Sequence, residues 1–194
     1  MKNNRLYNLD SFIGKTYDIS NNTGLQQRGI ADLIEDDLTN YIIDEYNGLP
    51  ARSRRSIEDV GLSNYSVLVD IKTKWIGDET EFHMPNLVSV DRIRKHYQYD
   101  NNYIEYVFVD YSVNNNTVTI NDIEYFKLEE IGWGNLHIQN LGKGQVQIKD
   151  ANKDIEKFNS NREEWLKLLK DNTLKFHDKQ IQKIQKERLI WENV

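Results

Sequence analysis

The hexapeptide Val67-Leu68-Val69-Asp70-Ile71-Lys72 places a carboxylate and an ammonium group inside an otherwise apolar run. Side chains of a β-strand alternate between its two faces, so Asp70 and Lys72 share one face with Leu68. An anion and a cation at the end of an apolar strand are costly unless they are paired and used. We interpret the pair as one half of a site for a divalent metal with a phosphate beside it.

A second carboxylate is expected near Asp70, because one carboxylate holds Mg²⁺ weakly. The sequence Ser63-Asn64 separates two apolar runs and predicts a two-residue hairpin turn. In that register Asp59 pairs with Leu68 and becomes the diagonal neighbour of Asp70, about 7–8 Å away between backbones. Glu58 then faces the opposite side. A turn longer or shorter by one residue reverses the choice, so Glu58 stays open as the alternative to Asp59.

These residues suit metal-assisted chemistry on a phosphate ester. Asp59, Asp70 and the backbone carbonyl of Ile71 offer oxygen ligands for one or two Mg²⁺ ions. Lys72 would orient the attacking water or offset the charge that develops on the phosphorus. The alternative is a surface hairpin whose aspartate and lysine are only solvated.

The pattern resembles the active-site motif of the PD-(D/E)XK nuclease superfamily, and more narrowly the EcoRV/HincII-like type II restriction endonucleases. The resemblance rests on the strand Asp70-Ile-Lys-Thr-Lys74 and the following Met84-Pro-Asn-Leu-Val-Ser89. Two shorter patches, Ala31-Asp-Leu-Ile-Glu35 and Asn159-Ser-Asn-Arg-Glu-Glu-Trp165, resemble an early helix and the opening of the C-terminal helical region. The family implies an α/β (α+β) fold, with a central mixed β-sheet flanked by helices.

The resemblance also implies a function and roles for individual residues. It implies Mg²⁺-dependent cleavage of double-stranded DNA at a short, palindromic site, with Asp59 and Asp70 as metal ligands and Lys72 as the catalytic lysine. Glu35 would be an auxiliary acid, with an ordinary solvated acid on the helix surface as the alternative. Asn86 would contact a base edge. Because a two-fold DNA site is matched most simply by a two-fold protein, we expect a homodimer.

The chain departs from the family pattern at two places. No proline precedes Asp59, although one is common in the superfamily. His83-Met84 stands where the relative has Gln-Ala, in a segment near the DNA bases, so His83 is a candidate DNA contact and the recognition sequence is not transferable.

Further DNA contacts are expected from basic and amide side chains in loops and at strand ends. The loop after Pro50 carries three arginines, Arg52, Arg54 and Arg55, which are either solvated or bound to phosphate. Lys74 ends the active-site strand. Gly142-Lys143-Gly144 predicts a flexible hairpin tip from which Lys143 and Gln145 would enter a groove; an ordinary turn is the alternative. Asn86 would act at the start of a helix, where a capping role is the alternative.

Composition sets the broad class of the protein. The 194 residues fit one catalytic and DNA-binding domain, 1–194, and the absence of cysteine suits a reducing cytoplasm. No apolar run reaches the length of a membrane span. The net charge of −6 is weak counter-evidence to DNA binding, because the bases are clustered. The four histidines lack the spacing of a zinc site.

The remaining pattern predicts the elements around the hairpin. We expect a helix from about Leu25 to Tyr46, with a buried stripe of Ile30, Leu33, Ile34, Leu38, Tyr41 and Ile42. A helix is expected from Pro85 to about Tyr99. Strands are expected at 103–111, 117–120, 136–140 and 145–149, and one long or two shorter helices from about Arg162. Another nuclease on the same scaffold and a non-catalytic DNA-binding domain remain the rival functions.

Overall fold

The computed structural model describes residues 5–20, 27–53, 56–77, 86–150 and 154–193. The chain divides into two compact units, one of residues 1–82 and 96–128 and the other of residues 83–95 and 129–194. The expectation that residues 1–194 act as one domain stays a prediction.

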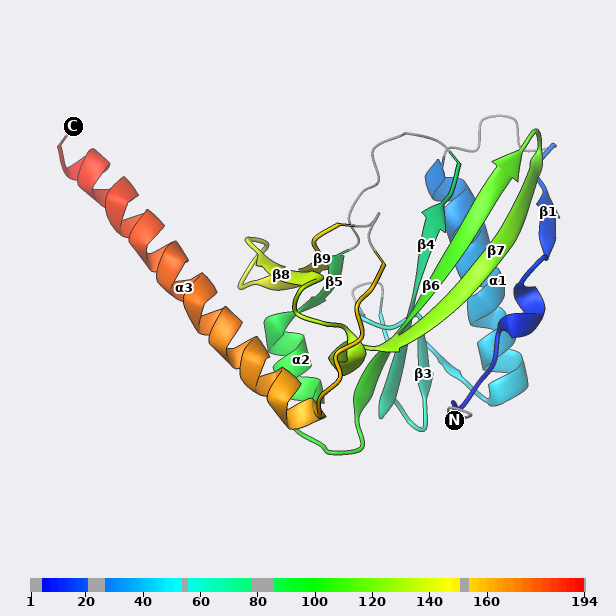
Figure 1. The fold of residues 1–194 in the computed structure, drawn as a ribbon, viewed down its shortest axis with the longest axis horizontal. Coiled ribbons are helices and arrows are strands. Elements are labelled where there is room, and N and C mark those ends of the chain that lie inside the picture. The colour runs from blue at the N-terminus through cyan, green and yellow to red at the C-terminus, as the bar shows by residue number, and fades with distance from the viewer. Residues whose placement is uncertain (1–4, 21–26, 54–55, 78–85, 151–153, 194) are drawn as a thin grey trace. The chain divides into compact units, whose positions relative to one another are not determined.

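The first unit is built on a six-stranded mixed sheet in the order β1-β7-β6-β4-β3-β2 (Figure 1). Only β4 and β6 are parallel among these neighbours; the other pairs are antiparallel. The strands are β1 (Thr16–Asp18), β2 (Leu49–Pro50), β3 (Val60–Leu62), β4 (Val67–Trp75), β6 (Tyr103–Asn114) and β7 (Thr117–Lys127). Short 3₁₀ turns occur at Asp10–Phe12 in this unit and, where the second unit begins, at Leu128–Glu130. The mixed α+β architecture expected from the sequence is confirmed.

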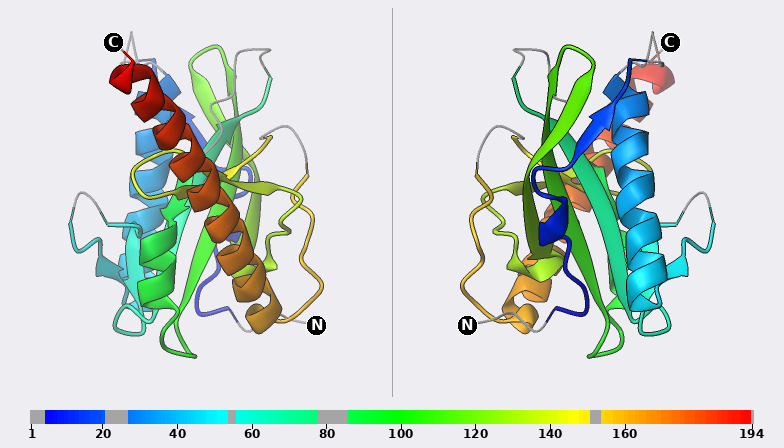
Figure 2. Two further views of the ribbon diagram at one scale, coloured as in Figure 1. Left: turned by 90° about the vertical axis from the view of Figure 1, so that its left-hand side faces the viewer. Right: turned by 90° about the vertical axis from the view of Figure 1, so that its right-hand side faces the viewer.

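Helix α1 (Gln27–Tyr46) lies alongside the sheet in both views of Figure 2. It buries Ile30, Ile34, Leu38 and Ile42, a 3–4 spacing that forms one apolar stripe. Leu33 was expected in this stripe but is 37% exposed, so that part of the prediction is wrong. Val67, Val69 and Ile71 of β4 belong to the same core as this stripe, which puts Asp70 and Lys72 on the opposite face of the sheet.

The turn between β3 and β4 differs from the predicted two-residue hairpin. Leu62 pairs with Val67 and Val60 with Val69, so four residues form the turn and the predicted pairs Leu62–Tyr65, Val60–Val67 and Asp59–Leu68 are wrong. Ser63, Asn64 and Tyr65 take φ values of 48°, 55° and 62°, left-handed conformations that sequence pattern alone did not indicate. Because the register moved by two residues, every side chain kept its predicted face.

The second unit contains a three-stranded antiparallel sheet and a long helix. The sheet order is β5-β9-β8, with β5 (Asn86–Ser89), β8 (Leu136–Gln139) and β9 (Gln145–Ile148). The predicted β8–β9 hairpin is therefore confirmed. α3 (Arg162–Glu192) is one continuous helix, and the side chain of its N-cap Asn161 accepts a 2.9 Å bond from the backbone N–H of Glu164. Trp165 anchors the helix by donating from its indole nitrogen to the carbonyl oxygen of Ile131 at 2.9 Å.

The helix expected over residues 85–99 is wrong at its start. Residues 86–89 form β5, and α2 covers only Val90–His96. The physical reason is tertiary pairing: Leu87 and Val88 are buried while Asn86 and Ser89 pair with β9, and this ladder outweighs the helix-starting preference of the preceding proline. In the described ranges, no helix is both long and apolar enough to cross a bilayer.

Candidate active site

Asp59, Asp70 and Lys72 converge where β3 begins beside the middle of β4. The pairing of Val60 with Val69, continued by one residue, sets Asp59 opposite Asp70. The Nζ atom of Lys72 donates to Oδ1 of Asp70 at 2.7 Å and lies 3.4 Å from the carbonyl oxygen of Ile71. Oδ2 of Asp59 accepts a 2.7 Å bond from the backbone N–H of Ile71. Two carboxylates, an ammonium and a carbonyl therefore share one small region.

The local structure explains why these groups meet. Asp59 directly precedes β3 and is tied to β4 by its own N–H, which donates to the carbonyl oxygen of Val69 at 2.9 Å. Asp70 is held in the middle of a strand that is buried from Val67 to Ile71. Its side chain therefore cannot leave the site without distorting the sheet.

Burial and like charge make Asp70 an unusual carboxyl group. Asp70 is only 3% exposed and its pKa is raised to about 8, because burial raises it more than Lys72 lowers it and the neighbouring Asp59 adds to the rise. Burial lowers the pKa of Lys72, but Asp70, Asp59 and Glu35 outweigh it and hold the pKa above its ordinary value. With Asp59 and Asp70 both ionised, the site would carry more negative charge than Lys72 alone balances.

Glu35 reaches the same region from α1. Its Oε1 atom lies 3.4 Å from the hydroxyl oxygen of Thr73, which donates to it, at the end of β4. Burial raises the pKa of Glu35 to about 7, with Lys72 lowering it and Asp59 and Asp32 raising it. Thr73 shares its strand face with Ile71 on the α1 side, whereas Asp70 and Lys72 lie on the other face, so the role of Glu35 as an auxiliary acid stays a prediction.

The donor set fits a hard divalent cation. Asp59, Asp70 and the carbonyl of Ile71 supply oxygen atoms, and a cation would offset both the burial of the Asp70 carboxylate and its repulsion by Asp59, which together raise the pKa of Asp70. Across the part of the chain that the structure describes, no group of three or more His, Asp or Glu side chains forms a ready-made metal site. Any metal would therefore use the two aspartates with the backbone carbonyl and water or phosphate oxygens.

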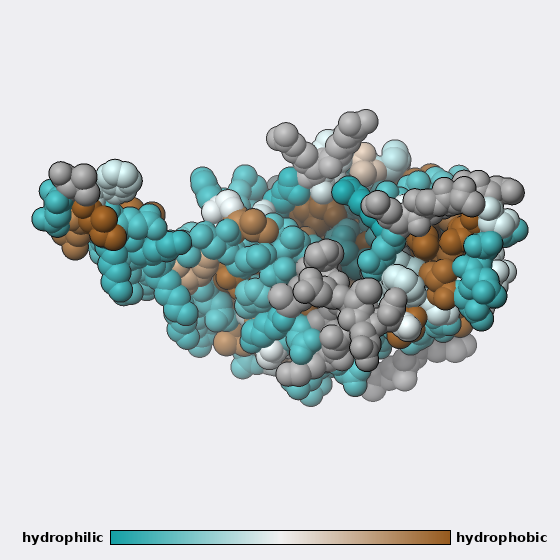
Figure 3. Space-filling view, turned by 90° about the horizontal axis from the view of Figure 1, so that it is seen from above, coloured by the Kyte–Doolittle hydropathy of each residue, from teal (hydrophilic) through white to brown (hydrophobic). Residues whose placement is uncertain are grey.

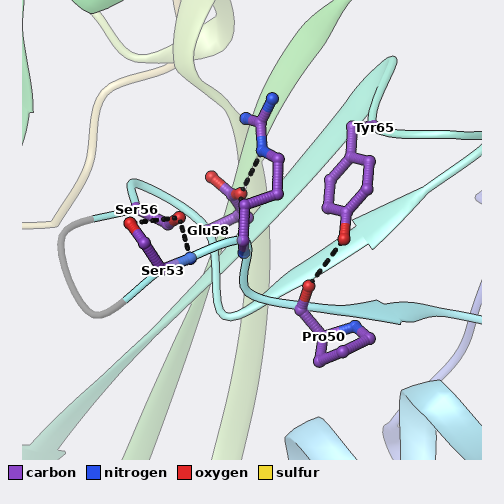
Figure 4. Close-up of polar contacts among 6 residues, drawn as sticks. Pro50, Ser53, Ser56, Glu58 and Tyr65 are labelled. Carbon is purple, nitrogen blue, oxygen red and sulfur yellow. Dashed lines mark hydrogen bonds and ion pairs between the residues drawn. The ribbon is translucent and has the colours of Figure 1, made fainter.

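Glu58, the alternative to Asp59, forms an ion pair with Arg52 instead of joining Asp70 (Figure 4). Its Oε1 atom accepts a 2.8 Å charged bond from Nε of Arg52. Burial raises the pKa of Glu58, but the bond from Arg52 more than compensates and leaves the pKa below its ordinary value. The structure thus brings Asp59 rather than Glu58 to Asp70.

The proposed DNA contacts divide between the two units. In the first, Lys74 pairs in register with Asp110 on β6. In the second, Asn86 is exposed at the start of β5 rather than at a helix start, and Lys143 is exposed in the β8–β9 turn. Gln145 opens β9 opposite Gln139. Arg54, Arg55 and His83 lie outside the described residues.

Sequence reasoning missed one buried group beside Asp70. Tyr106 of β6 is the register partner of Asp70 and is buried, and within the described ranges its hydroxyl has no hydrogen-bond partner. Arg52 was among the expected loop cations, but its pairing with Glu58 is seen only in the structure. The alternation of β6 could have placed Tyr106 on the Asp70 face, had the parallel pairing been known.

Comparisons with known proteins bear on the fold. No family model matches the sequence, and no curated protein matches it. Among solved structures, the NlaIV restriction endonuclease is similar with a TM-score of 0.57 and 15% sequence identity, over 84% of this chain and 74% of that chain. The protein therefore has a restriction-endonuclease-like fold.

Proposed function

We propose that this protein is a Mg²⁺-dependent type II restriction endonuclease that hydrolyses phosphodiester bonds of double-stranded DNA at a short, palindromic site. The observation that carries the proposal is the convergence of Asp59, Asp70 and Lys72 on a restriction-endonuclease-like fold. The sequence motif that resembles the EcoRV/HincII-like branch of the PD-(D/E)XK superfamily supports the same assignment.

Each side chain has a role that its contacts support. Asp59, Asp70 and the carbonyl of Ile71 would hold Mg²⁺, which when bound supplies an activated water and stabilises negative charge on the phosphate. Lys72, at 2.7 Å from Asp70, presents an ammonium group at the same place and would orient the attacking water or offset developing charge. Glu35, whose pKa is raised to about 7, is suited to exchange a proton near neutral pH.

DNA recognition would use the exposed polar side chains of the second unit. An asparagine amide bonds adenine bidentately, and Asn86 is exposed at the start of β5. Lys143 and Gln145 belong to the hairpin that pairs with β5, so all three side chains are carried by one small sheet. Lys74, Arg54, Arg55 and His83 complete the proposed contacts. A homodimer in the cytoplasm, with one active site for each strand, fits a palindromic site and a restriction-modification role.

Substitution of Lys72 tests the catalytic assignment. Lys72→Ala is expected to abolish Mg²⁺-dependent plasmid cleavage while leaving DNA binding in Ca²⁺ measurable, because the ammonium acts in chemistry rather than in holding DNA. Lys179→Ala, which removes an exposed lysine of α3, is the matched control and should cut normally. Cleavage by Lys72→Ala at the wild-type rate would show that the site is wrongly assigned.

The digestion pattern separates the rival functions. Discrete plasmid fragments with mapped, identical end sequences support a restriction enzyme, whereas cutting only at branched or damaged DNA supports a repair or junction-resolving nuclease. DNA binding without any metal-dependent cleavage supports a non-catalytic domain.

Asn86→Ala tests the readout. It should relax or weaken site preference by about 1–3 kcal/mol at one base pair, and Asn101→Ala, at an exposed turn, should not. An unchanged cleavage profile would remove Asn86 from recognition.

A further inference from the structure

Arg52 is held in a fixed orientation at the base of the β3–β4 hairpin. Its Nε atom donates to Oε1 of Glu58 at 2.8 Å, and its backbone N–H points to the same oxygen at 3.5 Å. The guanidinium carbon lies 4.7 Å from the ring centre of Tyr65. The hydroxyl of Tyr65 donates in turn to the carbonyl oxygen of Pro50 at 2.8 Å, which fixes the ring (Figure 4). Glu58 and Tyr65 thus support one cation from two sides.

This arrangement costs folding free energy that stability alone does not explain. The side chain of Glu58 is fully buried, and within the described residues its Oε2 atom has no hydrogen-bond partner. A buried carboxylate with one cation is often matched or exceeded in stability by apolar side chains of similar volume. Tyr65 also adopts a φ of 62°, an uncommon conformation for an aromatic residue.

The backbone is shaped to admit the aromatic ring. A Cβ atom added at Gly61 would lie 2.1 Å from Cδ1 of Tyr65, so the ring occupies the space that any larger residue would need. The strained turn and the glycine together place the ring under the guanidinium. Strain of this kind persists where surrounding structure enforces it, and it concentrates at functional sites.

The held guanidinium remains open to solvent. The Arg52 side chain is 54% exposed, and in the described part of the chain its bonds use only Nε and the backbone N–H. The two terminal amino groups therefore present a planar pair of donors. This geometry matches two oxygens of a phosphate, and a pre-oriented fork loses little side-chain entropy on binding.

We propose that Arg52 is a preformed binding site for a phosphate of the DNA backbone. Its anchor, Glu58, is the residue next to Asp59, so the same short segment carries a metal ligand on one residue and the support of a phosphate-binding arginine on the other. The inference rests on the proposed DNA-cleaving function and adds to it a residue that fixes the position of the duplex. In a chain with a net charge of −6, such local cations must supply the attraction to DNA.

The salt dependence of DNA binding tests this role. Binding of a 30-base-pair duplex to the full chain would be measured in Ca²⁺ between 50 and 200 mM salt. Loss of one phosphate contact lowers the slope of log K against log salt by about 0.9, so the wild-type affinity should fall about 3.5-fold more than that of Arg52→Ala over this range. Arg94→Ala removes an exposed arginine that already pairs with Asp91, and its slope should equal that of the wild type.

A variant that keeps the bond to Glu58 guards against loss of folding. Because a lysine could still reach a phosphate, the variant used for this purpose is Arg52→Gln, whose amide can donate to Glu58 but carries no charge for a phosphate. Its slope should therefore fall as in Arg52→Ala. An unchanged slope in either folded variant, even with a lower Tm, would show that Arg52 only stabilises the hairpin and would overturn the proposal. Failure of the wild-type chain to bind DNA at all would instead overturn the proposed function.

Discussion

Glu35→Gln should stabilise the metal-free protein at alkaline pH and not at acid pH. Burial raises the pKa of Glu35 from its ordinary value of 4.5 to about 7, so the folded state holds a proton that the unfolded state releases between these values. Stability contributed by the protonated form is complete below pH 4.5 and is lost as the pH rises to 7. Glutamine mimics the protonated carboxyl at every pH and avoids that loss.

The size of the effect follows from the pKa. A rise from 4.5 to about 7 corresponds to about 3 kcal/mol at 25 °C. Because Glu35 is only partly buried and solvent screens its charge, we expect a measured difference of about 1–2 kcal/mol between pH 4 and pH 8.5.

Urea unfolding in EDTA at pH 4, 6, 7 and 8.5 measures this difference directly. The free energy of unfolding of Glu35→Gln minus that of the wild type should grow between pH 4.5 and 7 and then remain constant. Asp36→Asn changes an exposed acid on the same helix and should shift stability by no more than about 0.5 kcal/mol at any pH. If the Glu35→Gln difference is equal at pH 4 and pH 8.5, the pKa of Glu35 is the same in the folded and unfolded states, and the predicted rise on folding is wrong.

Two further perturbations probe the hairpin and its carboxylates. Gly61→Ala should destabilise the protein by about 1–3 kcal/mol in urea unfolding, because the new Cβ meets the Tyr65 ring; in the Tyr65→Ala background the cost should largely vanish, and strictly additive costs would argue against the contact. Ca²⁺ should raise the Tm of the wild type more than that of Asp70→Asn, since binding to the folded state stabilises it by mass action, and equal shifts would place the cation elsewhere.

Strand periodicity made part of the site predictable from the sequence. Asp70 and Lys72 are two residues apart in one strand, so their shared face depends only on the alternation of side chains. The same is true of the stripe on α1 that brings Glu35 near the hairpin, because helical periodicity is local. The mixed sheet was likewise indicated by the apolar runs that became β4, β6 and β7.

Tertiary structure decided what depends on contacts between distant residues. The choice of Asp59 over Glu58 needed the turn length, and three residues with positive φ made that turn two residues longer than its sequence indicates. The predicted face of Asp59 was correct only because the register error was two residues, an even number. Asn86 lies in a strand because it pairs with Gln147 of β9, 61 residues later in the chain, and local preference cannot reveal such a partner.

The burial and the pKa values of the site residues could not be predicted from the sequence either. The sequence by itself determined which residue types alternate on one strand, because that follows from backbone geometry. The burial of Asp70 and the effect of Lys72 and Asp59 on the pKa of Glu35 follow from the packing of separate segments. The same packing fixes Arg52 between Glu58 and Tyr65. Burial and electrostatic coupling arise when separate segments exclude water together, and no single segment carries that information.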